Sequence, residues 1–262
     1  MRSAAFFDLD KTILGTSSSL AFTRPFYDKG LIGRADVVRS AYRQFAFTIG
    51  SADHEQTERM RQYLSTLVAG WDVESLQQIV DDSLDDIVTP TVHAEALELI
   101  ERHHAEGREV VIVSASGSEI VNPIAGLLGA DHVIATELEV ADGRYTGGIR
   151  FYAYGPNKAT AMTEFARTHE IDLDASFAYS DSITDVPMLE AVGNPYVVNP
   201  DTSLRDLAVE HGWPVLSWEK PAALKRPIID HPEQRKQALI VAGVVAIAIA
   251  WWWRRGRRSE VA

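Results

Sequence analysis

Four separated groups of polar residues in this chain could together transfer a phosphoryl group. They are residues 8–12 (Asp-Leu-Asp-Lys-Thr), Ser114 with the amides after it, Lys158, and residues 181–185 (Asp-Ser-Ile-Thr-Asp). A phosphoryl group carries negative charge on several oxygens, so its catalyst needs a cation, hydrogen-bond donors, a nucleophile and a proton shuttle. Each group supplies at least one of these parts. The prediction rests on the whole set, because each group alone is common in proteins.

The two aspartates of the first group would carry the covalent chemistry. Two neighbouring carboxylates can have different pKa values when their environments differ. Asp8 directly ends the apolar run at residues 4–7, and we predict that it attacks phosphorus and forms an aspartyl-phosphate. Asp10 is then the predicted general acid and base, which protonates the leaving oxygen and later takes a proton from the attacking water.

The last group is predicted to bind a metal ion. Asp181, together with Asp8, would offer oxygen ligands to a hard divalent cation such as Mg²⁺. The cation would reduce the repulsion between the attacking carboxylate and the phosphate oxygens.

Hydrogen bonds and positive charge for the phosphate would come from the two remaining groups. Ser114 and the amide of Ala115 are predicted to donate hydrogen bonds to phosphate oxygens at a strand-to-helix turn. Lys158 would balance the remaining negative charge. Asp185 has three possible roles at this stage: it holds a metal-bound water, orients Lys158, or simply begins a helix.

Apolar runs that alternate with helical patterns predict the fold that would position these groups. The four predicted buried strands are residues 4–7, 109–113, 176–179 and 196–198, and the predicted helices between them are residues 90–106 and 157–169. This alternation indicates a doubly wound, mostly parallel α/β sheet of the Rossmann-like kind. Such sheets bind ligands at the carboxyl ends of their strands, and Asp8, Ser114 and Asp181 all stand at predicted carboxyl ends.

A long insertion separates the first two predicted strands. Residues 16–88 exceed a normal crossover connection and contain helical patterns at 35–47, 54–67 and 73–87. We predict an inserted helical cap there, and a catalytic core made of residues 1–15 and 89–218. Residues 138–151 are predicted to form a small hairpin beside the sheet.

The C-terminal part has a different composition. Residues 219–237 read as a loop-rich linker, residues 238–253 contain no charged side chain, and residues 254–262 form a basic tail. Sixteen helical residues span about 24 Å, slightly less than a hydrocarbon layer of about 30 Å. We predict a transmembrane or interfacial helix that anchors a cytoplasmic catalytic body to a bacterial membrane; a buried core helix is the alternative.

Charge and cysteine content exclude several classes of function. The chain has a net charge of −12, and residues 1–219 carry 16 positive and 34 negative side chains. An acidic body argues against nucleic acid as a partner, because phosphate backbones need a basic surface. The absence of cysteine excludes disulfides, thiolate metal sites and cysteine nucleophiles.

The four groups resemble the motifs of the haloacid dehalogenase-like hydrolase superfamily, most closely the phosphoserine phosphatase-like group of subfamily IB. Residues 6–12 match its first motif, Ser114 its second, Lys158 its third and residues 180–185 its fourth. The resemblance covers about residues 4–218.

This resemblance implies Asp8 as nucleophile, Asp10 as general acid and base, and Mg²⁺ held by Asp8, the main-chain carbonyl of Asp10, and Asp181. Thr12 and Asp185 would contact these residues and hold them in position.

Three functions stay open at this stage. The first is a phosphatase for a small, phosphoserine-like metabolite, and the same residues would also serve transfer to an alcohol. The second is a membrane-associated phosphatase for a lipid phosphate such as lysophosphatidate or phosphatidylglycerophosphate. The third is a non-catalytic regulatory module that binds phosphate. The second motif continues with Ala115-Ser116 where phosphoserine phosphatases usually carry Gly-Gly, and the fourth motif also differs from theirs.

Overall fold

The apolar run at the N-terminus forms the central strand of a sheet. In the computed structural model, which describes residues 2–33 and 54–219, β1 (Ala4–Asp8) is buried along its whole length. It pairs in parallel with β2 (Glu109–Gly117) on one side and with β5 (Phe177–Ser180) on the other. A strand covered by helices on both faces must be apolar on both, which explains why this run does not alternate with polar residues.

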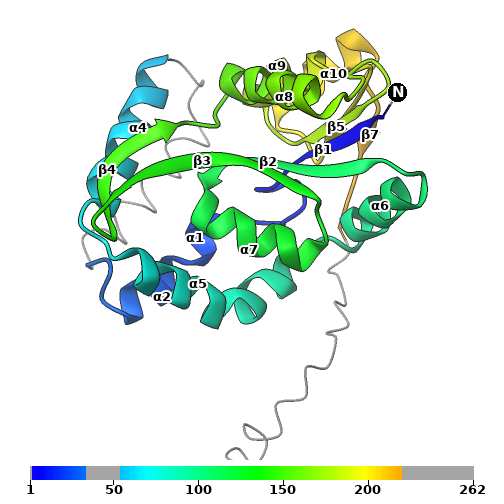
Figure 1. The fold of residues 1–262 in the computed structure, drawn as a ribbon. Coiled ribbons are helices and arrows are strands. Elements are labelled where there is room, and N and C mark those ends of the chain that lie inside the picture. Colours follow the sequence, from blue (N-terminus) through cyan, green and yellow to red (C-terminus); the bar gives the residue numbers. More distant parts are fainter. Residues whose placement is uncertain (1, 34–53, 220–262) are drawn as a thin grey trace, which may run out of the picture. The chain divides into compact units, whose positions relative to one another are not determined.

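The full sheet has seven strands in the order β4-β3-β2-β1-β5-β6-β7 (Figure 1). The remaining strands are β3 (His132–Ala141), β4 (Arg144–Phe151), β6 (Asn194–Val198) and β7 (Val215–Leu216). Only the β3–β4 pair is antiparallel. The predicted doubly wound, mostly parallel α/β architecture is therefore confirmed for the described residues.

The predicted hairpin at 138–151 forms, but it belongs to the main sheet and does not lie beside it. The first half of β3 pairs in parallel with β2, from His132 to Thr136, and only its second half pairs with β4. The hairpin is thus the edge of the main sheet. The hairpin forms because β3 continues beyond the end of β2. The edge of β3 would be exposed there, and β4 pairs with it.

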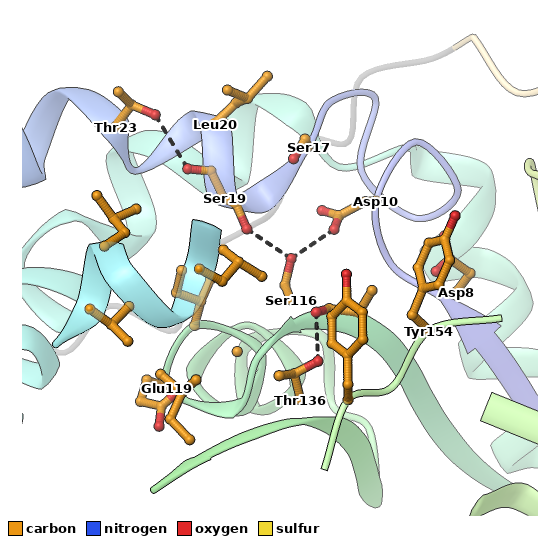
Figure 2. A pocket seen from close by; sticks show the side chains of 18 of the residues that line it. Asp8, Asp10, Ser17, Ser19, Leu20, Thr23, Ser116, Glu119, Thr136 and Tyr154 are labelled. Atoms are coloured by element: carbon orange, nitrogen blue, oxygen red, sulfur yellow. Dashed lines mark hydrogen bonds between the residues drawn. The ribbon is translucent and has the colours of Figure 1, made fainter. Parts of the chain in front are cut away.

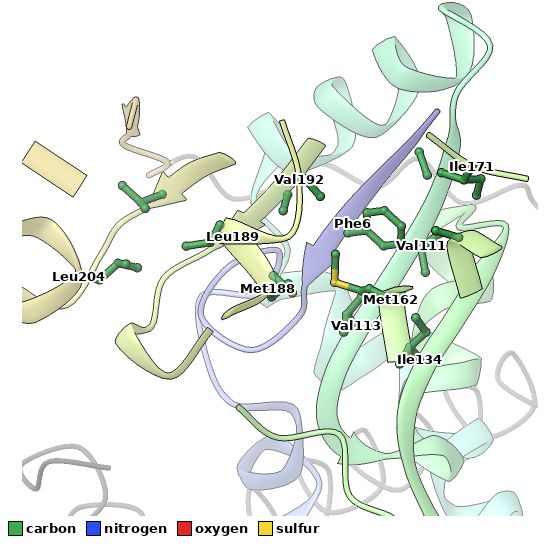
Figure 3. Packing of buried hydrophobic residues seen from close by; sticks show 14 of the residues in the cluster. Phe6, Val111, Val113, Ile134, Met162, Ile171, Met188, Leu189, Val192 and Leu204 are labelled. Carbon is green, nitrogen blue, oxygen red and sulfur yellow. The ribbon is translucent and has the colours of Figure 1, made fainter. Parts of the chain in front are cut away.

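Helices cover both faces of the sheet (Figure 1). On one face lie α6 (Ala94–Ala105) and α7 (Ser118–Leu128), and on the other lie α8 (Pro156–His169), α9 (Val186–Glu190) and α10 (Thr202–His211). The second face is packed by apolar side chains (Figure 3): Phe6 and Val111 from the sheet meet Met162 of α8 and Met188 of α9. All four are fully buried.

The described part of the insertion is helical, which confirms the helical patterns at 54–67 and 73–87; its division from the core as a cap stays a prediction. It contains α1 (Ser18–Ala21), α2 (Thr23–Asp28), α4 (His54–Val68) and α5 (Val73–Val88), followed by the short 3-10 helix η1 (Thr89–Thr91). Helix α4 contacts β4, and α5 contacts α7. The loop between α4 and α5 also bonds to the sheet edge, because the Tyr145 amide donates to the Trp71 carbonyl at 3.0 Å and the Gly70 amide donates to the Tyr145 carbonyl at 2.8 Å.

The described residues all belong to one compact unit, Met1–Ala223. Several predicted parts lie outside the described residues: the helix at 35–47, the linker beyond residue 219, the apolar segment at 238–253 and the basic tail. Among the helices that are described, none is long and apolar enough to cross a membrane.

Candidate active site

A pocket of about 300 Å³ lies at the carboxyl ends of β1, β2 and β5, and the cap helices line its opposite wall. The strand register explains why the predicted groups meet there. Asp8 pairs with Val113, directly before Ser114, and Phe7 pairs with Tyr179, two residues before Asp181. The strand ends are therefore at one level.

Lys158 joins two of the predicted carboxylates. Its Nζ donates to Asp8 Oδ1 and to Asp185 Oδ2, each at 2.7 Å. The three side chains are almost fully buried, at 3%, 5% and 2% exposure for Lys158, Asp8 and Asp185. Asp185 also accepts the hydroxyl of Ser180 at 2.7 Å. Of the roles considered for Asp185, this geometry matches the orientation of Lys158.

The beginning of α8 places the lysine. Gly155 has φ of +54° and Pro156 follows as the first helical residue. Glycine tolerates that backbone conformation without steric cost, and proline fits the first turn because its missing N–H would be unpaired there anyway. The chain thus turns sharply from the sheet into a helix whose first turn carries Lys158 into the pocket.

Burial and charge shift the ionisation of this group of residues. Burial raises the pKa of Asp8 well above its usual range, Lys158 opposes that shift, and Asp185 and Asp181 add to it. For Lys158, burial lowers the pKa, but Asp185 and Asp8 outweigh burial and the net shift is upward. We conclude that the ammonium is charged and that it favours the ionised form of Asp8.

Asp181 lies in the same pocket and contacts the first motif. The Thr12 hydroxyl donates to Asp181 Oδ1 at 3.3 Å, and Thr12 itself is fully buried. Burial, and next the charge of Asp185, raise the pKa of Asp181 to about 7. Asp8, Asp181 and Asp185 thus concentrate negative charge around one lysine, which is the setting in which a bound cation is stabilised.

The donor set fits Mg²⁺. Carboxylate and carbonyl oxygens are its preferred ligands, and it usually binds through one or two carboxylates and completes its shell with water and substrate phosphate. Among the described residues no three His, Asp or Glu side chains converge as a metal site. Asp8 and Asp181 would therefore need the main-chain carbonyl of Asp10 as the third protein ligand, as the motif resemblance implies.

Asp10 is held by a network of serine side chains that the sequence did not reveal (Figure 2). The Ser18 amide donates to Asp10 Oδ1 at 2.5 Å, and the Ser116 hydroxyl donates to Oδ2 at 2.9 Å. Ser116 Oγ in turn lies 2.9 Å from Ser18 Oγ and 3.0 Å from Ser19 Oγ. Ser18 and Ser19 belong to α1, so the network connects the predicted acid and base to the cap.

The irregular last residues of β2 present Ala115 and Ser116 to the pocket, whereas Ser114 lies behind it. Ser114 is fully buried, is not part of the pocket wall, and accepts the Ser116 amide at 3.2 Å. The β2–β3 register shifts between Ser114 and Gly117, and such bulges redirect side chains. Thr136 holds this part of β2 in place because its hydroxyl donates to the Ala115 carbonyl at 2.7 Å.

Comparisons with known proteins agree with this geometry. Residues 5–190 match the family described as haloacid dehalogenase-like hydrolase. The chain is 52% identical over 247 residues to a probable phosphatase of Mycobacterium tuberculosis, covering 94% of this chain and 85% of that protein. It is 31% identical over 217 residues to a phosphoserine phosphatase of the same organism, covering 82% and 70%.

A solved structure has the same fold. It is the crystal structure of a protein of unknown function from Bordetella pertussis Tohama I, with a TM-score of 0.73 and 30% identity, and the match covers 82% of this chain and 98% of that one. With the family match spanning more than half of the chain, the resemblance predicted from the motifs is confirmed. The chain belongs to the haloacid dehalogenase-like hydrolase family and is one of its phosphatases.

Proposed function

We propose that this phosphatase hydrolyses phosphate monoesters with Mg²⁺ through an aspartyl-phosphate on Asp8. The observation that carries the proposal is the position of the Asp8 carboxylate, which sits at the end of the pocket, 2.7 Å from the Lys158 ammonium. A carboxylate that is oriented beside a fixed cation can act, in its ionised form, as a nucleophile toward phosphorus.

The two chemical steps follow from the proposed roles. An oxygen of Asp8 bonds to phosphorus while the bond from phosphorus to the ester oxygen breaks, and Asp10 gives that oxygen its proton. Water then bonds to phosphorus, gives a proton to Asp10, and the bond from phosphorus to Asp8 breaks. Lys158 and the amides of Ala115 and Ser116 would stabilise the charge on the phosphate oxygens. Mg²⁺ would add charge neutralisation at Asp8, Asp181 and the Asp10 carbonyl.

The similarity to a phosphoserine phosphatase supports a small, phosphoserine-like substrate as one candidate. A lipid phosphate is the second candidate, because the uncharged segment at 238–253 would bring the pocket close to a membrane. A regulatory module without catalysis is not favoured, since Asp8, Asp10 and Lys158 all line the pocket.

Asp8→Asn tests the nucleophile. With p-nitrophenyl phosphate and Mg²⁺, we expect the wild type to release phosphate and the variant to lose at least about 10³-fold in kcat, because an amide cannot attack phosphorus. Asp206→Asn, at an exposed position of α10, is the matched control and keeps full activity. Undiminished turnover by the Asp8 variant would refute the proposal, provided that circular dichroism shows both variants folded.

A further inference from the structure

The pocket has two chemically different ends. Asp8, Asp10 and Lys158 line the end at the strands, together with Asp181 and Asp185. The other end is formed mainly by carbon-rich side chains, which come from the cap helices, from the α4–α5 loop and from α7: Leu20, Phe26, Leu64, Leu67, Trp71 and Ile120. A wall of this kind stabilises a ligand by removing its apolar surface from water.

Trp71 occupies a fixed place in this apolar wall. Its carbonyl accepts a hydrogen bond from the amide of Tyr145 at 3.0 Å. Its ring packs against that of Phe26 in a T-shaped arrangement, with centroids 5.6 Å apart and planes at 65°. Phe26 is only 7% exposed and stacks on Phe22 as well. The apolar end is therefore a formed surface, built from packed aromatic rings.

Among the described residues that line the pocket, the only charged side chain away from the phosphate end is acidic. Figure 2 shows Glu119, from the first turn of α7, on the far side of Ser116 from Asp8. Burial raises the pKa of Glu119, and the bonds that stabilise its carboxylate come from its own amide and from the hydroxyls of Tyr145 and Ser118.

This charge pattern opposes a substrate that carries a carboxylate. Lys158 is already bound by two aspartates, and Lys11 lies at the phosphate end, where its charge acts on Asp181. Of the described residues that line the pocket, those away from the phosphate end would present carbon, hydroxyl groups and Glu119 to a carboxylate on the organic part of a substrate, and no cation. Burying such a charge without a cationic partner is strongly unfavourable.

We propose that the substrate is a phosphate monoester whose organic group is apolar and carries no carboxylate. This inference rests on the proposed phosphatase function and narrows its substrate class. It favours an alkyl or aryl body over an amino acid such as serine. The apolar group would lie against Leu20, Trp71 and Ile120 while the phosphate meets Asp8.

A substrate series tests the inference. We would measure kcat/KM for ethyl, butyl and hexyl phosphate and for O-phosphoserine, with Mg²⁺. Each methylene that is fully transferred from water to an apolar wall contributes about fourfold. We therefore expect hexyl phosphate to exceed both ethyl phosphate and O-phosphoserine by at least about tenfold. Benzyl and cyclohexylmethyl phosphate, with similar leaving alcohols, distinguish a preference for aromatic rings from one for saturated chains.

Variants locate the effect in the pocket. Leu20→Ser should lower the ratio of hexyl to ethyl kcat/KM several-fold, whereas Val209→Ser, at a residue 76% exposed on α10, should leave the ratio unchanged. Glu119→Gln, which keeps an acceptor for Tyr145, should raise kcat/KM for O-phosphoserine several-fold.

The outcomes separate this inference from the function on which it rests. If ethyl phosphate is hydrolysed but O-phosphoserine is preferred to hexyl phosphate, the inference is wrong and the phosphatase function stands. A flat series from ethyl to hexyl phosphate overturns it equally. If no ester in the set is hydrolysed, the proposed function fails and the inference fails with it.

Discussion

Lys158 is the residue on which the geometry of the site depends most. It is the shared donor for Asp8 and Asp185, and all three side chains are buried. Removing one partner of a buried ion pair leaves an uncompensated charge, which typically costs about 3–5 kcal/mol. The consequence of a substitution here should therefore be seen in both stability and activity.

Lys158→Met is expected to lower kcat by at least about 10²-fold, because a preorganised charge at the phosphate is lost. It should also lower the free energy of unfolding, because Asp8 and Asp185 then repel each other in a buried place. Steady-state kinetics and urea unfolding measure the two effects. Lys29→Met, at an exposed lysine of the cap, is the control. Wild-type activity in Lys158→Met would contradict a role for the ammonium at the phosphate.

Ser116→Ala should weaken proton transfer by Asp10. The lost bond is donated to a carboxylate, and bonds to charged groups contribute about 1.5–3 kcal/mol, or roughly 10–100-fold in rate. The defect should be large for an alkyl phosphate, whose leaving oxygen needs a proton, and small for p-nitrophenyl phosphate, whose leaving oxygen does not. Ser203→Ala, exposed on α10, is the control. Equal loss for both esters would show that Ser116 does not act through Asp10.

At the scale of elements, the sequence predicted the parts whose signals are local. An apolar run that ends in a polar residue marks β1 and β5, and the spacing of apolar residues marks α4, α5, α6 and α8. Asp8, Asp181 and Lys158 could be assigned to one site because parallel strands present their carboxyl ends together.

Features that depend on tertiary contacts were not predictable in this way. Helices α1 and α2 have 4 and 6 residues, too short for a periodic pattern. The bulge after Ser114 depends on pairing with β3, and it brings Ser116 to Asp10 across 106 positions of sequence. A serine near the end of a strand does not by itself indicate such a contact. Its departure from the usual Gly-Gly was the only available signal.

The packing of α6 against the sheet predicts a pH effect on stability. His103 is 2% exposed; its Nδ1 lies 3.1 Å from Arg108 Nη1 and its Nε2 lies 2.9 Å from the Tyr179 hydroxyl. Arginine only donates, so Nδ1 accepts and the neutral ring carries its proton on Nε2. Burial, and next the charge of Arg108, lower the pKa of His103 from 6.5 to about 4.

Between pH 6.5 and about 4 the unfolded chain therefore binds a proton at His103 that the folded chain does not. The stabilising contribution is complete above pH 6.5 and is lost as the pH falls through this window. At pH 5 the loss is expected to be about 2 kcal/mol. Urea unfolding at pH 7.5 and 5.0 should show a smaller drop for His103→Gln than for wild type. His211→Gln, at an exposed histidine, should behave as wild type, and equal drops for all three would contradict the assignment.

At the scale of the whole molecule, the distribution of charged residues along the chain suggests an acidic catalytic body followed by a basic attached segment. Residues 1–219 carry a charge of −18, and residues 220–262 carry +6 and include the uncharged run at 238–253. We expect the full chain to sediment with vesicles that contain anionic lipid, because basic side chains near such a surface each contribute about 1 kcal/mol. A chain truncated after residue 219 should stay in the supernatant and keep its Mg²⁺-dependent phosphatase activity. Equal distribution of the two chains would exclude the anchor.

The backbone bonds between the α4–α5 loop and the sheet edge restrict how substrate can reach the pocket. Gly70 and Trp71 bond to Tyr145, and the Val73 amide donates to the Gly143 carbonyl at 3.0 Å. A hinged swing of the entire cap away from the core would rupture all of these bonds at once. We therefore expect the Trp71 side of the pocket to remain bonded to the sheet edge while substrate enters and product leaves.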